Sequence, residues 1–572
     1  MRQAPGLPIL LLLVPGLALA QPATIRPDDP RQAAVDAIFS QYDRRDSPGC
    51  SVAVVKDGQV VLQKDYGMAD ISLGVARTSD TSHWLPYSEA RVFVALAVAQ
   101  LAREGKLGLD DPVRRYVPEL PEYAAAVTVR QLLHHASGLA DYGVLDVAFS
   151  PMTGRVSEDE FFRVLRRWGR LGFAPGAETM YSNTDYALLK ILVERVSGGS
   201  LQDYAQARWF GPLGMASTRL GASQATRHPG HALFHEAPGN GSGRVLSYRS
   251  SPTGGIAVTT SLNDLVRWEA ALRDPARGLG ALLQSLEAGA PPLADGAARE
   301  EFSFGVYRRT YQGIPMVAHR GVGGYAYLVQ RADRPLSVVT LCNSYPGMDR
   351  FGFEVAALFA SSPGQAKPLA TVDAPPPPGP VISIPDAELQ AYAGKYRNGN
   401  RSFTADIRVV EGALEFKPQG GQPFDPLRPV GDGRFTNQFD GSTFLITFKP
   451  GADGMVMSAW DVTRNESGGD DLLRWTPATW PTADRVAAYA GTYVGEAVEG
   501  TLYVRVDGER VLVAGRGLAE TTLEAIEAVD EFRGPDVYHT RFERDARGRV
   551  VALVLDATRV KGIRYVRSAA DQ

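Results

Sequence analysis

Residues 88–103 form an almost uninterrupted apolar run whose length is typical of a helix. Gly105 follows at a position where helices commonly end. A helix that is apolar on every side must be covered on every side, because a helix that faces solvent carries a polar face. The sequence therefore predicts a central helix, buried inside one domain, around which the other elements of that domain pack.

Strand-like segments lie both before and after this helix. Residues 49–55 and 60–62 flank Asp57-Gly58, a pair that strongly favours the turn of a β-hairpin. Further apolar runs at residues 325–330 and 337–342 also indicate strands. Strands at both ends of the region, with helices between them, predict an antiparallel sheet covered by helices, which is an α/β sandwich.

A run of prolines at residues 375–380 separates this region from the rest of the chain. Such a run cannot continue a helix or a central strand, and it acts as a stiff spacer. After it, short alternating runs separated by Gly and Asp turns predict all-β structure. The sequence Ala-Tyr-Ala-Gly-Lys-Tyr at 391–396 recurs as Ala-Tyr-Ala-Gly-Thr-Tyr at 488–493, so we expect two copies of a small antiparallel β-barrel.

The chain of 572 residues is too long for one hydrophobic core, so several domains are expected. We place a signal peptide at residues 1–20, the α/β sandwich at 21–362, a proline-rich linker at 363–384, a first β-barrel at 385–479 and a second at 480–572.

The N-terminal segment has the features of a secretory signal. Arg2 supplies the positive end, residues 7–14 the apolar stretch, and Ala18-Leu19-Ala20 the small-residue cleavage site. The apolar stretch is shorter than the ~20 residues of a membrane span. We therefore predict a periplasmic or secreted protein with no stable membrane anchor. The net charge of -4 argues against nucleic-acid or anionic-membrane partners, which call for basic patches.

The two cysteines, Cys50 and Cys342, each lie in an apolar run that indicates a strand. Export permits a disulfide, but a free cysteine also behaves as a small buried hydrophobe. Because a bridge requires a close approach of the two Cα atoms that a sequence does not show, two separate buried thiols are the favoured expectation.

Ser88 stands at the start of the predicted central helix, and Arg91 follows one turn later. A serine hydroxyl becomes a good nucleophile only when a base accepts its proton and backbone donors stabilise the oxyanion that forms. Two later stretches contain candidates for the base and the oxyanion donors. They are Tyr181-Ser182-Asn183 and His319-Arg320-Gly321-Val322, and the second leads into a strand.

These motifs, in their order along the chain, resemble those of the serine β-lactamase and penicillin-binding-protein superfamily. The resemblance covers about residues 34–358. The similarity is to its class C-like branch, with D-aminopeptidases, D,D-carboxypeptidases and esterases, in which Tyr-x-Asn and often His-x-Gly follow Ser-x-x-Lys. Residues 252–255, Pro-Thr-Gly-Gly, fit the same pattern. The resemblance implies that the two barrels are lipocalin-like and that a loop from one of them reaches the active site.

The resemblance assigns roles to the first two motifs. Ser88 would be the acylated nucleophile, Tyr181 the general base, and Asn183 a residue that positions the substrate. These roles imply a hydrolase that cleaves amides or esters, such as D-amino-acid peptides, through an acyl-serine intermediate. The expected partner is a small-molecule or peptide substrate, and the oligomeric state is left open.

The third motif receives supporting roles from the same resemblance. His319 and Gly321 would form this element, and the backbone N–H of Val322 would join that of Ser88 in an oxyanion hole. Arg320 replaces a residue that usually carries a hydroxyl group. It would either bind a substrate carboxylate or face solvent.

Arg91 departs from the family pattern, because no Ser-x-x-Lys occurs anywhere in the chain. A desolvated lysine can give up its proton and act as a base, whereas arginine keeps its charge. Arginine can still stabilise an anionic Tyr181 electrostatically. Lysine is scarce throughout, with 9 Lys against 51 Arg. Two interpretations remain open: a weakened or adapted enzyme, and an inactive binding or scaffold protein that keeps the fold.

The histidines outside these motifs do not indicate a metal site. His228, His231 and His235 lie close together in sequence, but Pro229-Gly230 indicates a loop rather than a metal-binding helix. The pair His134-His135 is expected in a buried support turn. We therefore predict neither a metal nor a cofactor.

Overall fold

The computed structural model describes the chain from residue 28 to residue 571, with gaps. The described residues are 28–85, 90–147, 157–221, 230–236, 245, 257–288, 301–311, 314–319, 326–331, 336–345, 349–360, 379–397, 404–418, 425–439, 442–451, 454–461, 466–467, 472–475, 482–498, 500–508, 510–515, 518–525, 530–534, 539–557 and 559–571. The predicted signal peptide, residues 375–378 of the proline run, Ser88 and the segment Arg320-Gly321-Val322 lie outside the described residues.

An antiparallel seven-stranded sheet forms the centre of the first part of the chain. Its order is β2-β1-β13-β12-β11-β10-β9, so strands from the two ends of this region lie side by side. The bounds are β1 Cys50–Lys56, β2 Gln59–Tyr66, β9 Glu301–Ser303, β10 Val306–Tyr311, β11 Ile314–His319, β12 Ala326–Arg331 and β13 Leu336–Cys342. The predicted hairpin corresponds to β1 and β2.

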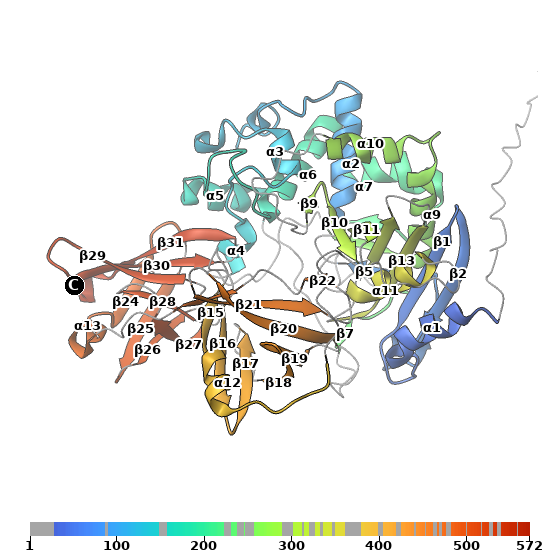
Figure 1. Ribbon diagram of the computed structural model, residues 1–572. Coiled ribbons are helices and arrows are strands. Elements are labelled where there is room, and N and C mark those ends of the chain that lie inside the picture. Colours follow the sequence, from blue (N-terminus) through green and yellow to red (C-terminus); the bar gives the residue numbers. More distant parts are fainter. Residues whose placement is uncertain are drawn as a thin grey trace, which may run out of the picture.

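Helices pack on this sheet in two separate apolar clusters (Figure 1). The larger contains α2 (Arg91–Arg103), whose residues are buried from Arg91 to Ala99, together with α6 (Asn183–Ser197). The smaller packs α1 (Pro30–Phe39) and α11 (Asp349–Ala360) against β1 and β13. The predicted central helix and the predicted α/β sandwich are therefore present. We refer to residues 30–360 as the sandwich.

Shorter elements complete the sandwich around these layers. The remaining helices are α3 Val129–Leu133, α4 Tyr142–Val147, α5 Glu158–Trp168, α7 Leu201–Ala205, α8 Gly211–Leu213, α9 Leu262–Arg273 and α10 Leu279–Ala288. The short strands are β3 Met68–Asp70, β4 Val75–Ala76, β5 His83–Leu85, β6 Arg219–Leu220, β7 His235–Glu236, β8 Val258–Thr260 and β14 Ser344–Tyr345. Among the described helices, none has both the length and the apolar character needed to span a membrane.

Cys50 and Cys342 form a disulfide, so the expectation of two separate thiols is wrong. Cys50 begins β1 and Cys342 ends β13, and the two residues are directly paired in the antiparallel register with a Cα–Cα distance of 4.1 Å. The two residues are 292 apart in sequence, and only the strand pairing brings them together.

Two barrel-like β structures follow the sandwich. In the first (β15–β23, with helix α12, Asp386–Tyr392), pairing of β20 with β21 brings the two ends of the sheet together. Its strands are β15 Gly394–Arg397, β16 Thr404–Val410, β17 Ala413–Pro418, β18 Asp425–Gly431, β19 Arg434–Phe439, β20 Ser442–Gly451, β21 Gly454–Asp461, β22 Glu466–Ser467 and β23 Leu472–Trp475.

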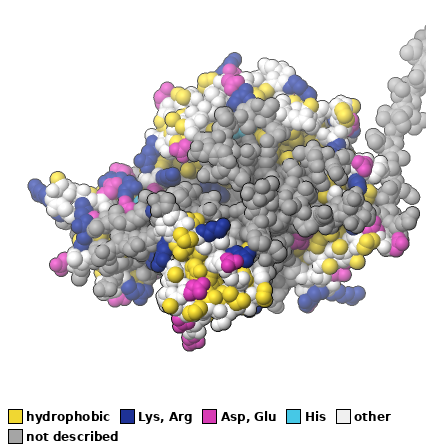
Figure 2. All heavy atoms as spheres, in the orientation of Figure 1, with side chains coloured by type: hydrophobic (Ala, Val, Ile, Leu, Met, Phe, Trp, Pro, Cys, Tyr) yellow, Lys and Arg dark blue, Asp and Glu magenta, His cyan; other side chains and the backbone are white. Residues whose placement is uncertain are grey.

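The second barrel (β24–β31, with helix α13, Ala483–Ala487) is closed. Its strands are β24 Gly491–Gly495, β25 Thr501–Asp507, β26 Arg510–Gly515, β27 Leu518–Ala525, β28 Glu531–Arg533, β29 His539–Arg544, β30 Val550–Ala557 and β31 Val560–Arg567. On the face shown in Figure 2, positive and negative side chains are interspersed over the described surface.

The repeated hexapeptide has the same structural detail in both barrels. The Tyr396 hydroxyl donates to the Tyr392 carbonyl at 2.8 Å, and the Tyr493 hydroxyl donates to the Tyr489 carbonyl at 2.7 Å. In each copy the ring of the second tyrosine is buried in the barrel core, so the hydrogen bond ties the end of the helix, or the residues just after it, to the first strand of the barrel. The sequence repeat therefore reflects a structural repeat.

The second barrel packs directly against the sandwich. Ala140, Leu145 and Trp168 of the sandwich belong to the same buried cluster as the barrel core. Arg167 donates to the carbonyl of Val498, and Arg170 donates to the carbonyl of Gly562 at 2.5 Å. In Figure 1, α4 lies at this boundary. The contact places the start of β31 against the sandwich.

Candidate active site

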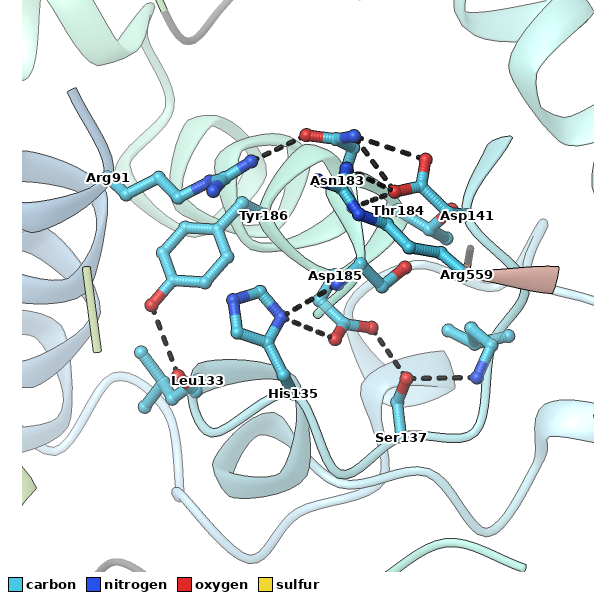
Figure 3. Close-up of polar contacts among 12 residues, drawn as sticks. Arg91, Leu133, His135, Ser137, Asp141, Asn183, Thr184, Asp185, Tyr186 and Arg559 are labelled. Carbon is cyan, nitrogen blue, oxygen red and sulfur yellow. Dashed lines mark hydrogen bonds and ion pairs between the residues drawn. The ribbon is translucent and has the colours of Figure 1, made fainter. Parts of the chain in front are cut away.

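The starts of α2 and α6 bring together three of the predicted site residues. Arg91 is the first residue of α2, Asn183 is the first residue of α6, and Tyr181 lies two residues before it. Because the two helices pack against each other, residues 92 apart in sequence become neighbours. Figure 3 shows the polar contacts around Arg91 and Asn183.

Arg91 is fully buried and binds groups on both sides of its guanidinium. Its Nη2 donates to Oδ1 of Asn183 at 2.5 Å. Its Cζ lies 4.4 Å from the ring centroid of Tyr181 and 5.2 Å from that of Tyr186. A guanidinium over an aromatic face is attracted by the ring quadrupole, most strongly where water is excluded. Arg91 is therefore integrated into the site.

Asp141 fixes the orientation of the Asn183 amide. The Nδ2 of Asn183 donates to Asp141 Oδ1 and Oδ2 at 3.1 and 2.9 Å, and its backbone N–H donates to Oδ2 at 3.2 Å. Asp141 is fully buried and also accepts from the backbone N–H of Gly143. Because the amide nitrogen donates to Asp141, the amide oxygen points toward Arg91 (Figure 3).

Arg559, from the turn between β30 and β31, completes this group from the second barrel. Its Nη1 donates to Asp141 Oδ2 at 3.3 Å, and its Cζ lies 4.4 Å from the ring centroid of Tyr181. The expected loop from a barrel thus belongs to the second barrel. Sequence reasoning missed Arg559, because a single arginine between two alternating strands gives no signal of a distant contact.

A buried turn behind Tyr181 supports the site, as expected for His134-His135. The His135 ring lies 4.8 Å from the Tyr181 ring, and its Nδ1 lies 3.0 Å from Asp185 Oδ2. The backbone N–H of Ser182 also donates to this Nδ1, at 3.2 Å. The hydroxyl of Ser137 donates to Asp185 Oδ1 at 2.5 Å. The turn therefore links the ring of His135 to the start of α6.

Desolvation favours the neutral form of both members of the His135–Asp185 pair. Burial holds the pKa of His135 well below its usual range, with Arg91 and Arg559 acting in the same direction. Burial raises the pKa of Asp185 well above its usual range. The distance between the two groups would also suit an ion pair, but desolvation opposes both charges. Because Nδ1 accepts from a backbone N–H, the protonated Asp185 carboxyl is the donor toward it.

The other predicted site residues are only partly described. His319 ends β11, where its backbone pairs with Leu328. Ser88, Arg320, Gly321 and Val322 lie outside the described residues, and their predicted roles stay predictions.

The histidine cluster also gives no metal site in the described part of the chain. His231 Nδ1 lies 3.1 Å from the Ser82 hydroxyl, and His235 begins a short strand that pairs with β14. His228 is not among the described residues. Within the residues that the structure describes, no group of three or more His, Cys, Asp or Glu residues could hold a metal ion.

Comparison with known proteins relates the whole chain to D-aminopeptidases. The chain is 29% identical over 339 residues to a D-aminopeptidase of Brucella anthropi, which covers 57% of this chain and 62% of that relative. It is 25% identical over 556 residues to a D-aminopeptidase of Brucella canis, which covers 94% of this chain and 98% of the relative. The second alignment includes both barrels.

A solved structure and a protein family match as well. The octameric penicillin-binding protein homologue from Pyrococcus abyssi superposes with a TM-score of 0.53 at 20% identity, covering 77% of this chain and 99% of that one, which shows a shared fold. Residues 35–361, more than half of the chain, match the Beta-lactamase family. The predicted resemblance is confirmed: the chain belongs to the Beta-lactamase family.

Proposed function

We propose that this protein is an exported serine hydrolase that cleaves amide or ester bonds of small D-amino-acid substrates through an acyl-Ser88 intermediate. The observation that carries the proposal is the contact of Arg91 with both Tyr181 and Asn183. Tyr181 and Asn183 are the residues expected beside the nucleophile. Both contact Arg91, although lysine is the residue expected at that position.

In the proposed acylation step, Tyr181 accepts the proton of the Ser88 hydroxyl while Ser88 Oγ forms a bond to the substrate carbonyl carbon. Negative charge then develops on the carbonyl oxygen, where the backbone N–H groups of Ser88 and Val322 would bind it. As the intermediate collapses, the bond to the leaving amine or alcohol breaks, and the leaving group takes the proton from Tyr181.

In deacylation, a water molecule attacks the acyl-Ser88 carbonyl and gives a proton to Tyr181. The bond to Ser88 Oγ breaks, and Ser88 recovers the proton from Tyr181. Arg91 neither gives nor takes a proton in these steps, because a guanidinium stays charged. It acts as a fixed cation that favours the anionic form of Tyr181 and fixes the orientation of the Asn183 amide.

Two further observations support substrate class and location. A relative that the chain matches over 98% of its length carries the name D-aminopeptidase, and the alignment continues through both barrels. The Cys50–Cys342 disulfide is the type of bond that persists in oxidising compartments, which supports a periplasmic or secreted protein. The N-terminal segment has the composition of a secretory signal.

A serine-directed probe tests the proposal. The purified chain is incubated with a fluorophosphonate and, separately, with penicillin, and its intact mass is measured. We expect one covalent adduct, mapped by peptide sequencing to Ser88. The Ser88→Ala variant is the control and should remain unlabelled. Turnover is then measured with D- and L-alanine amides, for which we expect preference for the D form.

The competing proposal is that the chain is a non-catalytic binding or scaffold protein. The reason for it is that Arg91 stands where a lysine is expected. No adduct on Ser88 with any of a range of probes, in a chain shown to be folded, would support that alternative and reject the hydrolase. An adduct on another serine would reject the assigned nucleophile.

A further inference from the structure

The turn between β30 and β31 brings a second cation to the ring of Tyr181. The Cζ atoms of Arg91 and Arg559 both lie 4.4 Å from the Tyr181 ring centroid, although one arginine belongs to the sandwich and the other to the second barrel. Two cations with like charge repel each other, so this arrangement is costly unless an anion or an anionic form of the ring compensates them.

Several titratable or charged groups of the described residues lie in the cluster around Tyr181. From the sandwich they are Arg91 on α2, His135 on the turn after α3, Asp141 before α4, and Asp185 and Tyr186 on α6; from the barrel the group is Arg559. The side chain of His319 is not among those that the structure describes.

Burial favours the neutral form of three members of this set. It lowers the pKa of His135 and raises the pKa values of Asp185 and Tyr186. Two guanidinium groups thus face the ring of Tyr181, and one of them, Arg559, is held there by its hydrogen bond to Asp141. Both cations would stabilise a Tyr181 phenolate.

We propose that Arg559 is a positioning residue that acts through Tyr181, supplying from the second barrel a cation that stabilises its phenolate. This inference rests on the proposed function, because it assigns to Tyr181 the role of a base. The inference makes the second barrel part of the active site. The sandwich contributes Arg91 to the ring of Tyr181, and the barrel contributes Arg559.

The contacts of Arg559 suit this role. Its bond to the buried Asp141 holds the guanidinium beside the ring, while its side chain retains 40% exposure. Removal of Arg559 would take away one positive charge and leave the negative charge of Asp141 less compensated. Both effects disfavour a phenolate, so they act in the same direction.

The chain contains a matched control for this contact. Arg170 also ties the sandwich to the β30–β31 hairpin, through the carbonyls of Gly562 and Lys561, but its guanidinium stacks on Trp168. The Arg170→Gln variant thus weakens the attachment of the hairpin without removing a cation from Tyr181. A purely structural role for Arg559 would make the two glutamine variants behave alike.

The test measures ionisation of Tyr181 directly and needs no turnover. Tyrosinate absorbance is titrated in the natural chain and in Tyr181→Phe, and the difference isolates Tyr181. The same pair of measurements is made in the backgrounds Arg559→Gln, Arg559→Lys and Arg170→Gln. We expect Arg559→Gln to move the Tyr181 midpoint to higher pH by about one unit or more. Arg559→Lys should restore it, and Arg170→Gln should leave it unchanged.

The outcomes separate this inference from the proposed function. An unchanged midpoint in Arg559→Gln, or an equal shift in Arg170→Gln, would overturn the role of Arg559 even if Ser88 is acylated by the probes. A shift that only Arg559→Gln shows would support the role even if Ser88 is not acylated. Where turnover is found, the rising limb of the kcat/KM profile should move with the tyrosinate midpoint.

Discussion

The guanidinium of Arg91 donates a hydrogen bond of 2.5 Å to the side-chain oxygen of Asn183, joining the first residue of α2 to the first residue of α6. The same guanidinium stacks on the ring of Tyr181. One fully buried side chain thus holds both residues of the Tyr-x-Asn motif. Arg91 therefore connects the starts of the two helices through specific contacts.

The Arg91→Lys substitution tests whether those contacts matter for the proposed reaction. Lysine keeps a positive charge but lacks the planar fork that contacts Asn183 and the ring together. We expect kcat/KM for a D-amino-acid amide to fall about tenfold or more, the effect of losing a hydrogen bond to a charged group. Arg103→Lys, at the exposed end of the same helix, is the control and should be neutral. A rise in activity would instead show that the natural site is dormant.

Replacement of Asp185 tests the neutral pair with His135. Asparagine can still donate toward His135 Nδ1 and accept from the Ser137 hydroxyl, so Asp185→Asn should change the free energy of unfolding by less than about 1 kcal/mol. Asp185→Leu leaves buried polar groups without partners and should lower it by about 3 kcal/mol. Urea denaturation measures both variants. Equal damage from the two substitutions would indicate that Asp185 is ionised.

The Cys50–Cys342 disulfide should be detectable by alkylation of the cysteines and by its effect on the free energy of unfolding. Alkylation of the denatured chain should add nothing before reduction and two groups after it, as read from the intact mass. The variant with both cysteines changed to alanine should lose about 2–5 kcal/mol of unfolding free energy, because the bridge closes a long loop. Two alkylated cysteines in the unreduced chain would contradict the bridge.

His539 makes the stability of the second barrel depend on pH. Hydrogen bonds to Asp556 and Glu531, at 3.2 and 3.3 Å, raise its pKa above 6.5. The folded state then binds the proton more tightly than the unfolded state does. The stabilisation is therefore complete below pH 6.5 and is lost as the pH rises through the raised pKa.

The His539→Gln variant isolates this contribution. The difference in unfolding free energy between the natural chain and the variant should shrink by up to about 1 kcal/mol as the pH rises from 6 to 9, a modest amount because the three side chains are about a quarter exposed. A difference that stays constant over this range would mean that the His539 contacts do not depend on its charge.

Several features were determined by the sequence alone, because they depend on short-range patterns. The apolar run that forms α2, the Asp57-Gly58 turn between β1 and β2, and the repeated hexapeptide each act over a few residues, and the structure contains all of them. The ordered motifs likewise led to the family that residues 35–361 match. Tyr181, Asn183 and Arg91 were candidates before any contact was known.

Only the tertiary structure decided the relationships that depend on long-range packing. The bridge between Cys50 and Cys342 requires the register of β1 against β13, and the contact of Arg559 with Tyr181 requires the second barrel to dock on the sandwich. Neither residue pair shares a local pattern, because their partners lie 292 and 378 residues away along the chain. The sequence determined which residues were available, and the packing of sheets and barrels determined which of them meet.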